Sequence, residues 1–216
     1  MRIYTVLKTG GDFKISHVHA LKRQLDQFAP FDDFICLSDV NVPGVNTIKL
    51  KSQWPGYWAK MELFDPEIKG DFLYMDLDTV ILDDISHFEV GKTTLLRDFY
   101  RDGVHRSRSL NIVKPEGLGS GLMYLCEKDR GQVWRAFNRA PLNAINLNIN
   151  LGDQGFLEKY FLNDADRWQD VLPGQVVSWK VHCLAGHIPP SAKIVCMHGT
   201  PRPWAVNNFR KLYETA

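Results

Sequence analysis

Apolar residues in the first half of the chain fall into short runs separated by polar turns. The runs contain little alternation with polar residues, which favours strands that are covered on both faces of a sheet. Three such strands are predicted at Ile3–Leu7, Asp33–Leu37 and Val45–Leu50. Between the first two, apolar residues recur every three to four positions, and this spacing predicts a helix over Ile15–Phe28.

A second helix and a fourth strand follow. Proline suits the first turn of a helix, so Pro55 is expected to open a helix that continues to Phe64. The apolar run that begins at Phe72 predicts a central strand, and it is interrupted by two acids, Asp76 and Asp78. The resulting order of strands and helices is typical of an open, mostly parallel α/β sheet.

The second half of the chain is less regular. Two strands and two helices are predicted, at Thr93–Leu96, Leu122–Leu125, Val133–Asn138 and Gln154–Leu162. The basic stretch Arg101–Arg108 is expected to be a solvated loop. Because neither a repeat nor a linker is visible, we expect a single domain over residues 1–216. Residues 1–95 and residues 96–216 would form two halves of this domain, with one shared core.

Composition narrows the range of functions. The 216 residues are 44% hydrophobic and 24% charged, with a net charge of +1, which is ordinary for a globular enzyme and gives no footprint for nucleic acid. No apolar stretch approaches the roughly 20 residues that span a bilayer, and no signal peptide is visible. The four cysteines form no C-x-x-C pair, so buried, reduced thiols are expected. These features predict a cytoplasmic protein, and they leave its oligomeric state undetermined.

The acid pair is the first candidate for chemistry. Asp76 and Asp78 are one residue apart at the end of a predicted strand, where α/β proteins bind ligands. Two carboxylates in this place can hold one hard cation, and such a cation typically binds a diphosphate. In the alternative interpretation, one acid caps the next turn and the other is solvated.

Five further motifs occur in a fixed order around this pair. They are Leu7-Lys8-Thr9-Gly10-Gly11-Asp12-Phe13, Ala59-Lys60-Met61, Gly119-Ser120-Gly121, Asp153-Gln154-Gly155, and the turn from His198 and Gly199 to Arg202-Pro203-Trp204. Together with the acid pair they resemble the glycogenin-type sugar-nucleotide transferases of glycosyltransferase family 8, which have a GT-A fold. Lys60 precedes Asp76 by sixteen residues, as in that family.

The resemblance implies a single-domain, GT-A-like, metal-dependent transferase with a mostly parallel sheet flanked by helices. Residues 1–95 would form its nucleotide-binding half and residues 96–216 its sugar and acceptor half. It would move a hexose, glucose or galactose, from a UDP-sugar to a hydroxyl of a glycan or another acceptor, with retention of configuration. Asp76, Asp78 and His198 would hold Mn²⁺ or Mg²⁺, and an imidazole ligand modestly favours Mn²⁺. Asp153 and Gln154 would be the catalytic pair beside the anomeric carbon.

The resemblance also implies a set of donor-binding residues. These are Leu7, Thr9, Phe13, Lys60, Asp76, Leu77, Asp78, Asp98, Ser120, Gly199 and Arg202. Lys60 and Arg202 would contact the phosphates, where a guanidinium can donate two parallel hydrogen bonds. Phe13 would stack on the uracil, and Gly199 would let the backbone approach the diphosphate closely.

Several of these residues also have simple structural interpretations. Phe13 could simply pack in the core, and Thr9 could supply a hydroxyl that stabilises a turn. Asp98 could form a surface ion pair, and Ser120 could bond the backbone of its own strand. Asp153 could be the N-cap of a helix. For Lys60 the alternative is a solvated helix face, and for His198 a hydrogen bond to backbone in a turn.

The chain departs from the family pattern at four places. Gly119 replaces an Asn, Phe13 replaces a Tyr, the turn from His198 to Arg202 is two residues shorter, and the segment between Asp84 and Gly119 matches nothing recognisable. The departures leave the sugar and the acceptor undetermined.

Two other classes of protein share part of this pattern. Asp76 and Asp78 also fit the first motif of haloacid-dehalogenase-like phosphatases, but no second acid follows Gly152-Asp153 within the next four residues. A non-catalytic module that binds a sugar nucleotide or a glycan is the other alternative. Turnover of a UDP-sugar separates these classes.

Overall fold

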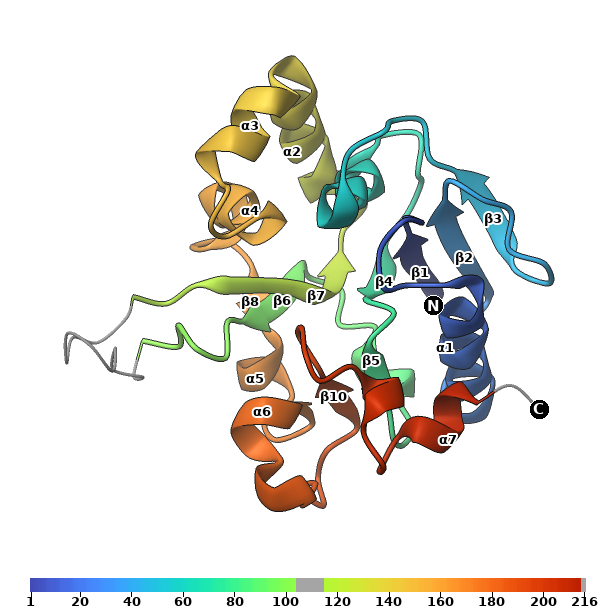
Figure 1. Cartoon of the computed structure of the whole chain (residues 1–216). Coiled ribbons are helices and arrows are strands. Elements are labelled where there is room, and N and C mark those ends of the chain that lie inside the picture. The colour runs from blue at the N-terminus through green and yellow to red at the C-terminus, as the bar shows by residue number, and fades with distance from the viewer. Residues whose placement is uncertain (104–114, 215–216) are drawn as a thin grey trace.

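A seven-stranded sheet forms the centre of the molecule (Figure 1). The computed structural model describes residues 1–103 and 115–214. The strand order is β3 (Asn46–Lys49), β2 (Asp33–Ser38), β1 (Arg2–Leu7), β4 (Phe72–Met75), β7 (Leu118–Leu125), β6 (Thr94–Arg97) and β8 (Asp166–Arg167). Strands β3, β2, β1 and β4 are parallel, whereas β7 runs antiparallel to both β4 and β6. The predicted mostly parallel α/β sheet is confirmed.

A second, three-stranded sheet adjoins the first. It contains β5 (Thr79–Ile81), β10 (Ile194–Cys196) and β9 (Val176–Ser178), in that order. The chain leaves β4 of the main sheet at Met75 and enters β5 of the second sheet at Thr79, through a turn in which the Thr79 amide donates to the Asp76 carbonyl at 3.0 Å. The acid pair therefore lies at the junction of the two sheets.

Helices cover both faces of the main sheet (Figure 1). They are α1 (Ile15–Phe28), the 3₁₀ helix η1 (Gly56–Phe64), α2 (Glu127–Arg139), α3 (Pro141–Leu147), α4 (Asp153–Phe161), α5 (Trp168–Val171), α6 (Trp179–His182) and α7 (Arg210–Tyr213). Short 3₁₀ turns are η2 (Ser86–Phe88), η3 (Leu184–Gly186) and η4 (Pro203–Ala205). Helix α1 packs beside α7, whereas α2 and α4 pack against η1.

The core extends through both halves of the chain. Leu21 and Leu25 of α1 pack in one cluster with Trp168, and on the other face Trp58 and Phe64 of η1 share a cluster with residues of α2 and α4. Trp168 is fully buried, and its indole N–H donates to a carbonyl of β7 at 3.1 Å. The division into a nucleotide half and a sugar half stays a prediction.

Some boundaries differ from the predicted ones. Helix α2 begins at Glu127, because acids in its first turn interact favourably with the helix dipole although they break the apolar spacing. Pro55 lies just before η1, which is a 3₁₀ helix, and α3 was missed in an Asn-rich stretch. Strand β7 extends back to Leu118, because the small residues 119–121 continue the strand toward the cavity. Most of the predicted loop 101–108 lies outside the described residues.

Two expectations from composition concern the described residues. All four cysteines are buried and free, in agreement with a packing role. Within residues 1–103 and 115–214, none of the helices has the length and apolar character required to cross a membrane.

Candidate active site

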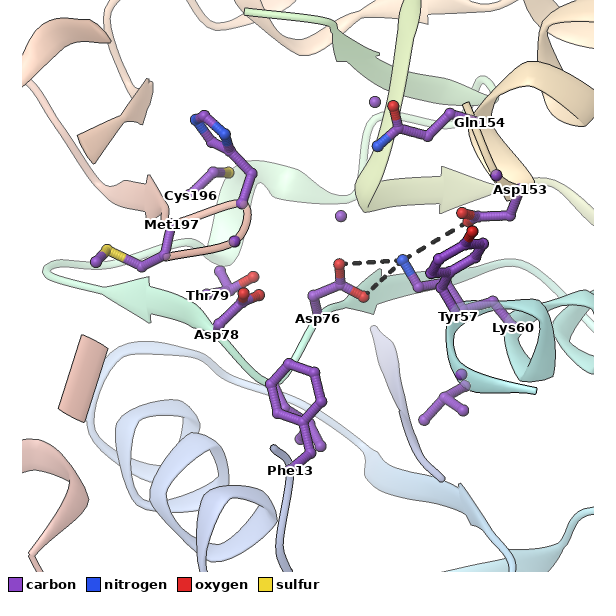
Figure 2. A pocket seen from close by; sticks show the side chains of 18 of the residues that line it. Phe13, Tyr57, Lys60, Asp76, Asp78, Thr79, Asp153, Gln154, Cys196 and Met197 are labelled. Atoms are coloured by element: carbon purple, nitrogen blue, oxygen red, sulfur yellow. Dashed lines mark hydrogen bonds and ion pairs between the residues drawn. The ribbon is translucent and has the colours of Figure 1, made fainter. Parts of the chain in front are cut away.

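A cavity of about 1010 Å³ opens above the ends of β1 and β4. Segments that are far apart in the sequence form its walls, namely 6–13, 55–60, 74–79, 96–100, 119–121, 150–154 and 196–202. All of the sequence motifs therefore contribute to one cavity. Figure 2 shows the labelled side chains that project into it.

A buried lysine forms the floor. The Lys60 ammonium lies 2.9 Å from Asp76, 3.7 Å from Asp153 and 3.3 Å from the Ser120 hydroxyl (Figure 2). Burial would lower the pKa of Lys60, but the carboxylates of Asp153 and Asp76 outweigh it and hold this pKa above its ordinary value. Lys60 is therefore a charged group of the cavity and not part of a solvated helix face.

A tyrosine holds Asp76 from the strand side. Tyr74 precedes Asp76 by two residues, so both side chains leave the backbone on the same side, and the Tyr74 hydroxyl donates to Asp76 Oδ1. A Cβ added to Gly121 would lie 3.2 Å from Asp76 Oδ2, so the neighbouring strand leaves just enough room for this carboxylate. The family motif did not reveal Tyr74, but the two-residue strand period gave a signal for it.

Arg202 pairs with the second acid of the motif. Its guanidinium contacts Asp78, lies 3.1 Å from Asp12 and stacks over the Phe13 ring at 4.7 Å. Burial and the negative charge of Asp76 raise the pKa of Asp78 to about 6, although Arg202 opposes this shift. Asp78 therefore lies in a place where additional positive charge is favourable.

Asp153 lies beneath the opposite wall. The Ser120 hydroxyl donates to Asp153 Oδ2 at 2.6 Å, and burial raises the pKa of this carboxyl against the effect of Lys60. The residue that caps α4 is Gly152, with φ of +65°, so the N-cap interpretation of Asp153 is wrong. The Ser120 hydroxyl and the Lys60 ammonium hold its carboxylate. Figure 2 shows Gln154 directed into the cavity from the same helix.

His198 is turned away from the acid pair. Its Nε2 shares a 2.5 Å hydrogen bond with the Ser178 hydroxyl, and its ring stacks on Phe99 with centroids 5.4 Å apart. Burial lowers the pKa of His198 to about 4, with Lys180 adding to this shift. Among residues 1–103 and 115–214, no group of three His, Cys, Asp or Glu is arranged to hold a metal ion. The structure does not bring His198 to Asp76 and Asp78, and a cation at these two acids stays a prediction.

The far end of the cavity is built by the turn after β1. The Thr9 amide and hydroxyl both donate to Asp39, at 3.0 and 2.7 Å, so this hydroxyl fixes the turn. Phe13 lines the cavity and packs edge-to-face on Trp204, with centroids 6.0 Å apart. Leu7 is fully buried and is not part of the cavity wall. The family motif contained no signal for Asp39.

Some of the remaining predicted residues line the cavity, and others bind the residues that line it. Leu77, Asp98 and Gly199 line the cavity, and Gly199 has φ of +94°, a conformation that favours glycine. Asp98 pairs with Arg101 at 2.9 Å, in agreement with its ion-pair interpretation. Ser120 is buried and supports Asp153 from below.

Comparisons with solved structures show the fold. The glycosyltransferase GlyE of Streptococcus pneumoniae TIGR4 superposes with a TM-score of 0.63 at 16% identity, covering 98% of this chain and 58% of GlyE. The galactosyltransferase LgtC, solved with donor and acceptor sugar analogues, gives 0.65 at 10% identity, covering 99% and 95%. The bifunctional glycosyltransferase WbbM gives 0.57 at 12% identity, covering 98% and 48%.

These likenesses confirm the expected single-domain GT-A-like α/β fold. The chain spans little more than half of GlyE but nearly all of LgtC. No family model and no curated protein matches the sequence. The solved structures therefore show the fold, whereas the sugar-transferase function and membership of family 8 stay predictions from the motifs.

A buried histidine beside Phe13 makes this end of the cavity sensitive to acid. His17 is 7% exposed, stacks on Trp204 at 3.8 Å, and accepts a hydrogen bond from the Lys14 amide through Nδ1. Burial, followed by the charges of Lys14 and Arg202, lowers the pKa of His17 to about 4, although Asp12 opposes the shift. Its neutral form is favoured in the folded state. Its contribution to stability is present above pH 6.5 and is lost as pH falls from about 6.5 toward 4.

We therefore expect His17→Gln to show a smaller fall in the free energy of unfolding over this pH window than the wild type. Urea unfolding at pH 7.5, 6, 5 and 4.5 measures this difference. His19→Gln, on the same helix, is the matched control and should follow the wild-type curve. Parallel curves for His17→Gln and wild type would contradict the assignment.

Proposed function

We propose that this protein is a metal-dependent glycosyltransferase that moves a hexose, glucose or galactose, from a UDP-sugar to an acceptor hydroxyl with retention. The observation that carries the proposal is the convergence of Asp76, Asp78, Lys60, Arg202 and the Asp153–Gln154 pair on one cavity. Simple binding of a sugar would not require two cations and three carboxylates in contact at its base.

The diphosphate of the donor would lie between the two cations. A developing negative charge on the leaving group is stabilised by positive groups that are already in place. Lys60 is fixed at the floor, and Arg202 can donate two hydrogen bonds to phosphate oxygens. Arg202 would have to exchange part of its contacts with Asp12 and Asp78 for the phosphate oxygens when the donor binds.

Asp76 and Asp78 would hold Mn²⁺ or Mg²⁺, with donor phosphate oxygens and water as the remaining ligands. The raised pKa of Asp78 supports a cation here, because positive charge nearby would favour its ionised form. When bound, the ion would offset charge on the diphosphate. His198 stays a predicted third ligand, and it would first have to leave the Ser178 hydroxyl.

The sugar would lie beside Asp153 and Gln154. The Gln154 amide can contact the sugar ring, and the buried Asp153 carboxylate can stabilise positive charge at the anomeric carbon across a short distance. In this scheme the acceptor hydroxyl attacks from the side of the leaving group and gives its proton to a phosphate oxygen. Thr9 and Phe13 remain the proposed contacts of the nucleoside.

The two alternatives remain distinguishable by turnover. No specific observation favours a non-catalytic sugar-nucleotide module or a haloacid-dehalogenase-like phosphatase over a transferase. Hydrolysis of UDP-glucose or UDP-galactose to free sugar and UDP would support the transferase, whereas release of inorganic phosphate from simple phosphate esters would support a phosphatase. A cytoplasmic location stays a prediction from the sequence.

The first prediction for the proposed function concerns the metal. Asp76→Asn and Asp78→Asn preserve shape while each removes a negative charge from the cation's ligands. Both should lose Mn²⁺-dependent binding of UDP, measured by calorimetry with Mn²⁺ and with EDTA. In a thermal-shift assay, UDP at 100 times its Kd should stabilise the wild type by about 2.7 kcal/mol.

The control for this prediction is Asp83→Asn, which changes an acid outside the cavity. It should bind UDP like the wild type. Equal UDP affinity of the wild-type protein in Mn²⁺ and in EDTA would refute the metal assignment.

The second prediction concerns the phosphates. Arg202→Ala should weaken UDP binding by about 10- to 150-fold, the range expected for hydrogen bonds to charged groups, and should barely affect uridine. Lys60→Ala should act in the same direction, but it also leaves Asp153 without its cation, so its melting temperature must be measured in parallel. Equal losses for UDP and uridine would assign these residues a structural role.

The third prediction concerns chemistry. Gln154→Ala and Asp153→Asn should lower turnover of UDP-glucose or UDP-galactose while leaving UDP affinity nearly unchanged, because their interactions are made chiefly in the transition state. Hydrolysis in the absence of an acceptor is the assay. Since Gly152 caps α4, a loss of activity in Asp153→Asn cannot come from a lost N-cap. Wild-type rates for both variants would remove this pair from the site.

A further inference from the structure

One aromatic ring at the cavity mouth has no part in the donor site described above. Tyr57 is 49% exposed and lines the cavity, whereas the seven residues that follow it in η1, from Trp58 to Phe64, are all buried. A large side chain in the second position of an otherwise buried helix would ordinarily pack inward. Tyr57 instead points into the open cavity (Figure 2).

The ring is held in place by a glycine. A Cβ added to Gly152 would lie 2.5 Å from Tyr57 Cε2 and 2.9 Å from its Cζ, so the ring rests directly on the Gly152 backbone. Gly152 also has φ of +65° and ψ of −147°, a conformation that suits glycine. Both the backbone conformation and the seat of the ring therefore require glycine here. The ring is consequently a fixed surface and not a freely rotating side chain.

The position of the ring relative to the floor follows from helix geometry. In a 3₁₀ helix the side chains at i and i+3 are eclipsed, so Tyr57 lies above Lys60, roughly 6 Å along the helix axis. Lys60 binds Asp76 and Asp153 at the floor, and Gly152 immediately precedes Asp153 and Gln154. Tyr57 thus lies on the same cavity wall as Asp153 and Gln154, and it is one helical turn nearer to solvent than Lys60.

We propose that Tyr57, seated on Gly152, is the platform on which the acceptor stacks, and that the acceptor group is a pyranose ring. This inference rests on the proposed transferase function and names the chemical class of its acceptor. A sugar presents a face of C–H groups that packs on an aromatic ring, and Tyr provides a rigid, amphipathic surface at low entropic cost. The amide side chains of Asn150 and Gln154 line the same part of the cavity and can bind the hydroxyls at the sugar's edge.

A second half-exposed tyrosine provides an internal comparison. Tyr100 also lines the cavity, but its ring lies 5.6 Å from that of His198, on the wall formed by the turn at 198–202. An acceptor on that wall would approach from the side of the phosphates. The platform on Tyr57 instead places the acceptor beside Asp153 and Gln154.

Saccharide binding to the UDP-saturated protein tests the platform directly. The probes are methyl β-D-glucopyranoside, lactose and maltose, followed by saturation-transfer NMR and calorimetry. We expect at least one probe to bind the wild type, Tyr57→Ala to weaken it at least about tenfold, equivalent to about 1.4 kcal/mol, and Tyr57→Phe to retain it. UDP affinity of Tyr57→Ala and Tyr57→Phe is measured in parallel, so that a loss specific to the saccharide is separated from a general loss of ligand binding.

Four results would overturn the inference. They are the absence of binding by all three saccharides, wild-type affinity in Tyr57→Ala, loss of binding in Tyr100→Ala but not in Tyr57→Ala, and binding of octyl glucoside without binding of methyl glucoside. The last result would place an apolar aglycone on the ring instead of the sugar.

The proposed function fails separately, if UDP and UDP-glucose do not bind. The saccharide titration is then repeated without nucleotide. Tyr57-dependent binding in that experiment would keep the sugar platform and remove only the transfer reaction.

Discussion

The buried ammonium of Lys60 is the interaction on which the site depends. It joins η1, the turn after β4, β7 and α4, because its neighbours Asp76, Ser120 and Asp153 come from the last three of these elements. A carboxylate removed from water without a partner is strongly unfavourable, so the buried Asp153 and the partly exposed Asp76 are both stabilised by the cation between them. The 3₁₀ helix supplies that cation from a segment that is otherwise packed into the core.

Charge in this cluster is not balanced by the protein alone. Three carboxylates, those of Asp76, Asp78 and Asp153, meet two cations, Lys60 and Arg202. The deficit falls on Asp78, where burial and its neighbour Asp76 raise the pKa. This imbalance supports the proposed divalent ion, which would also offset the negative charge of a bound diphosphate.

The sequence revealed those features of the fold and site that have a local pattern. Unbroken apolar runs predicted β1, β2 and β4, and regular spacing predicted α1 with its observed ends. The order of the motifs predicted that Lys60 and Arg202, which are remote in sequence, lie in one site, and both line the same cavity. The missed features depend on long-range partners. Asp39, which follows β2, accepts a hydrogen bond from Thr9, which follows the neighbouring strand β1. His198, which follows β10, bonds Ser178, which lies in another strand of the second sheet. Spacing within one segment contains no information about such partners.

The contact between the turn after β1 and the segment around η4 has a consequence for the order in which the molecule matures. Asp12 meets Arg202 across 190 residues of sequence, and His17 and Phe13 pack on Trp204. Contacts with so large a separation form late, because a long loop must first be closed. A nascent chain can therefore assemble β1–β4 and the Lys60 floor while it still lacks the end of the cavity around Phe13 and Arg202. The part of the cavity proposed for the nucleotide is complete only when residue 204 has left the ribosome.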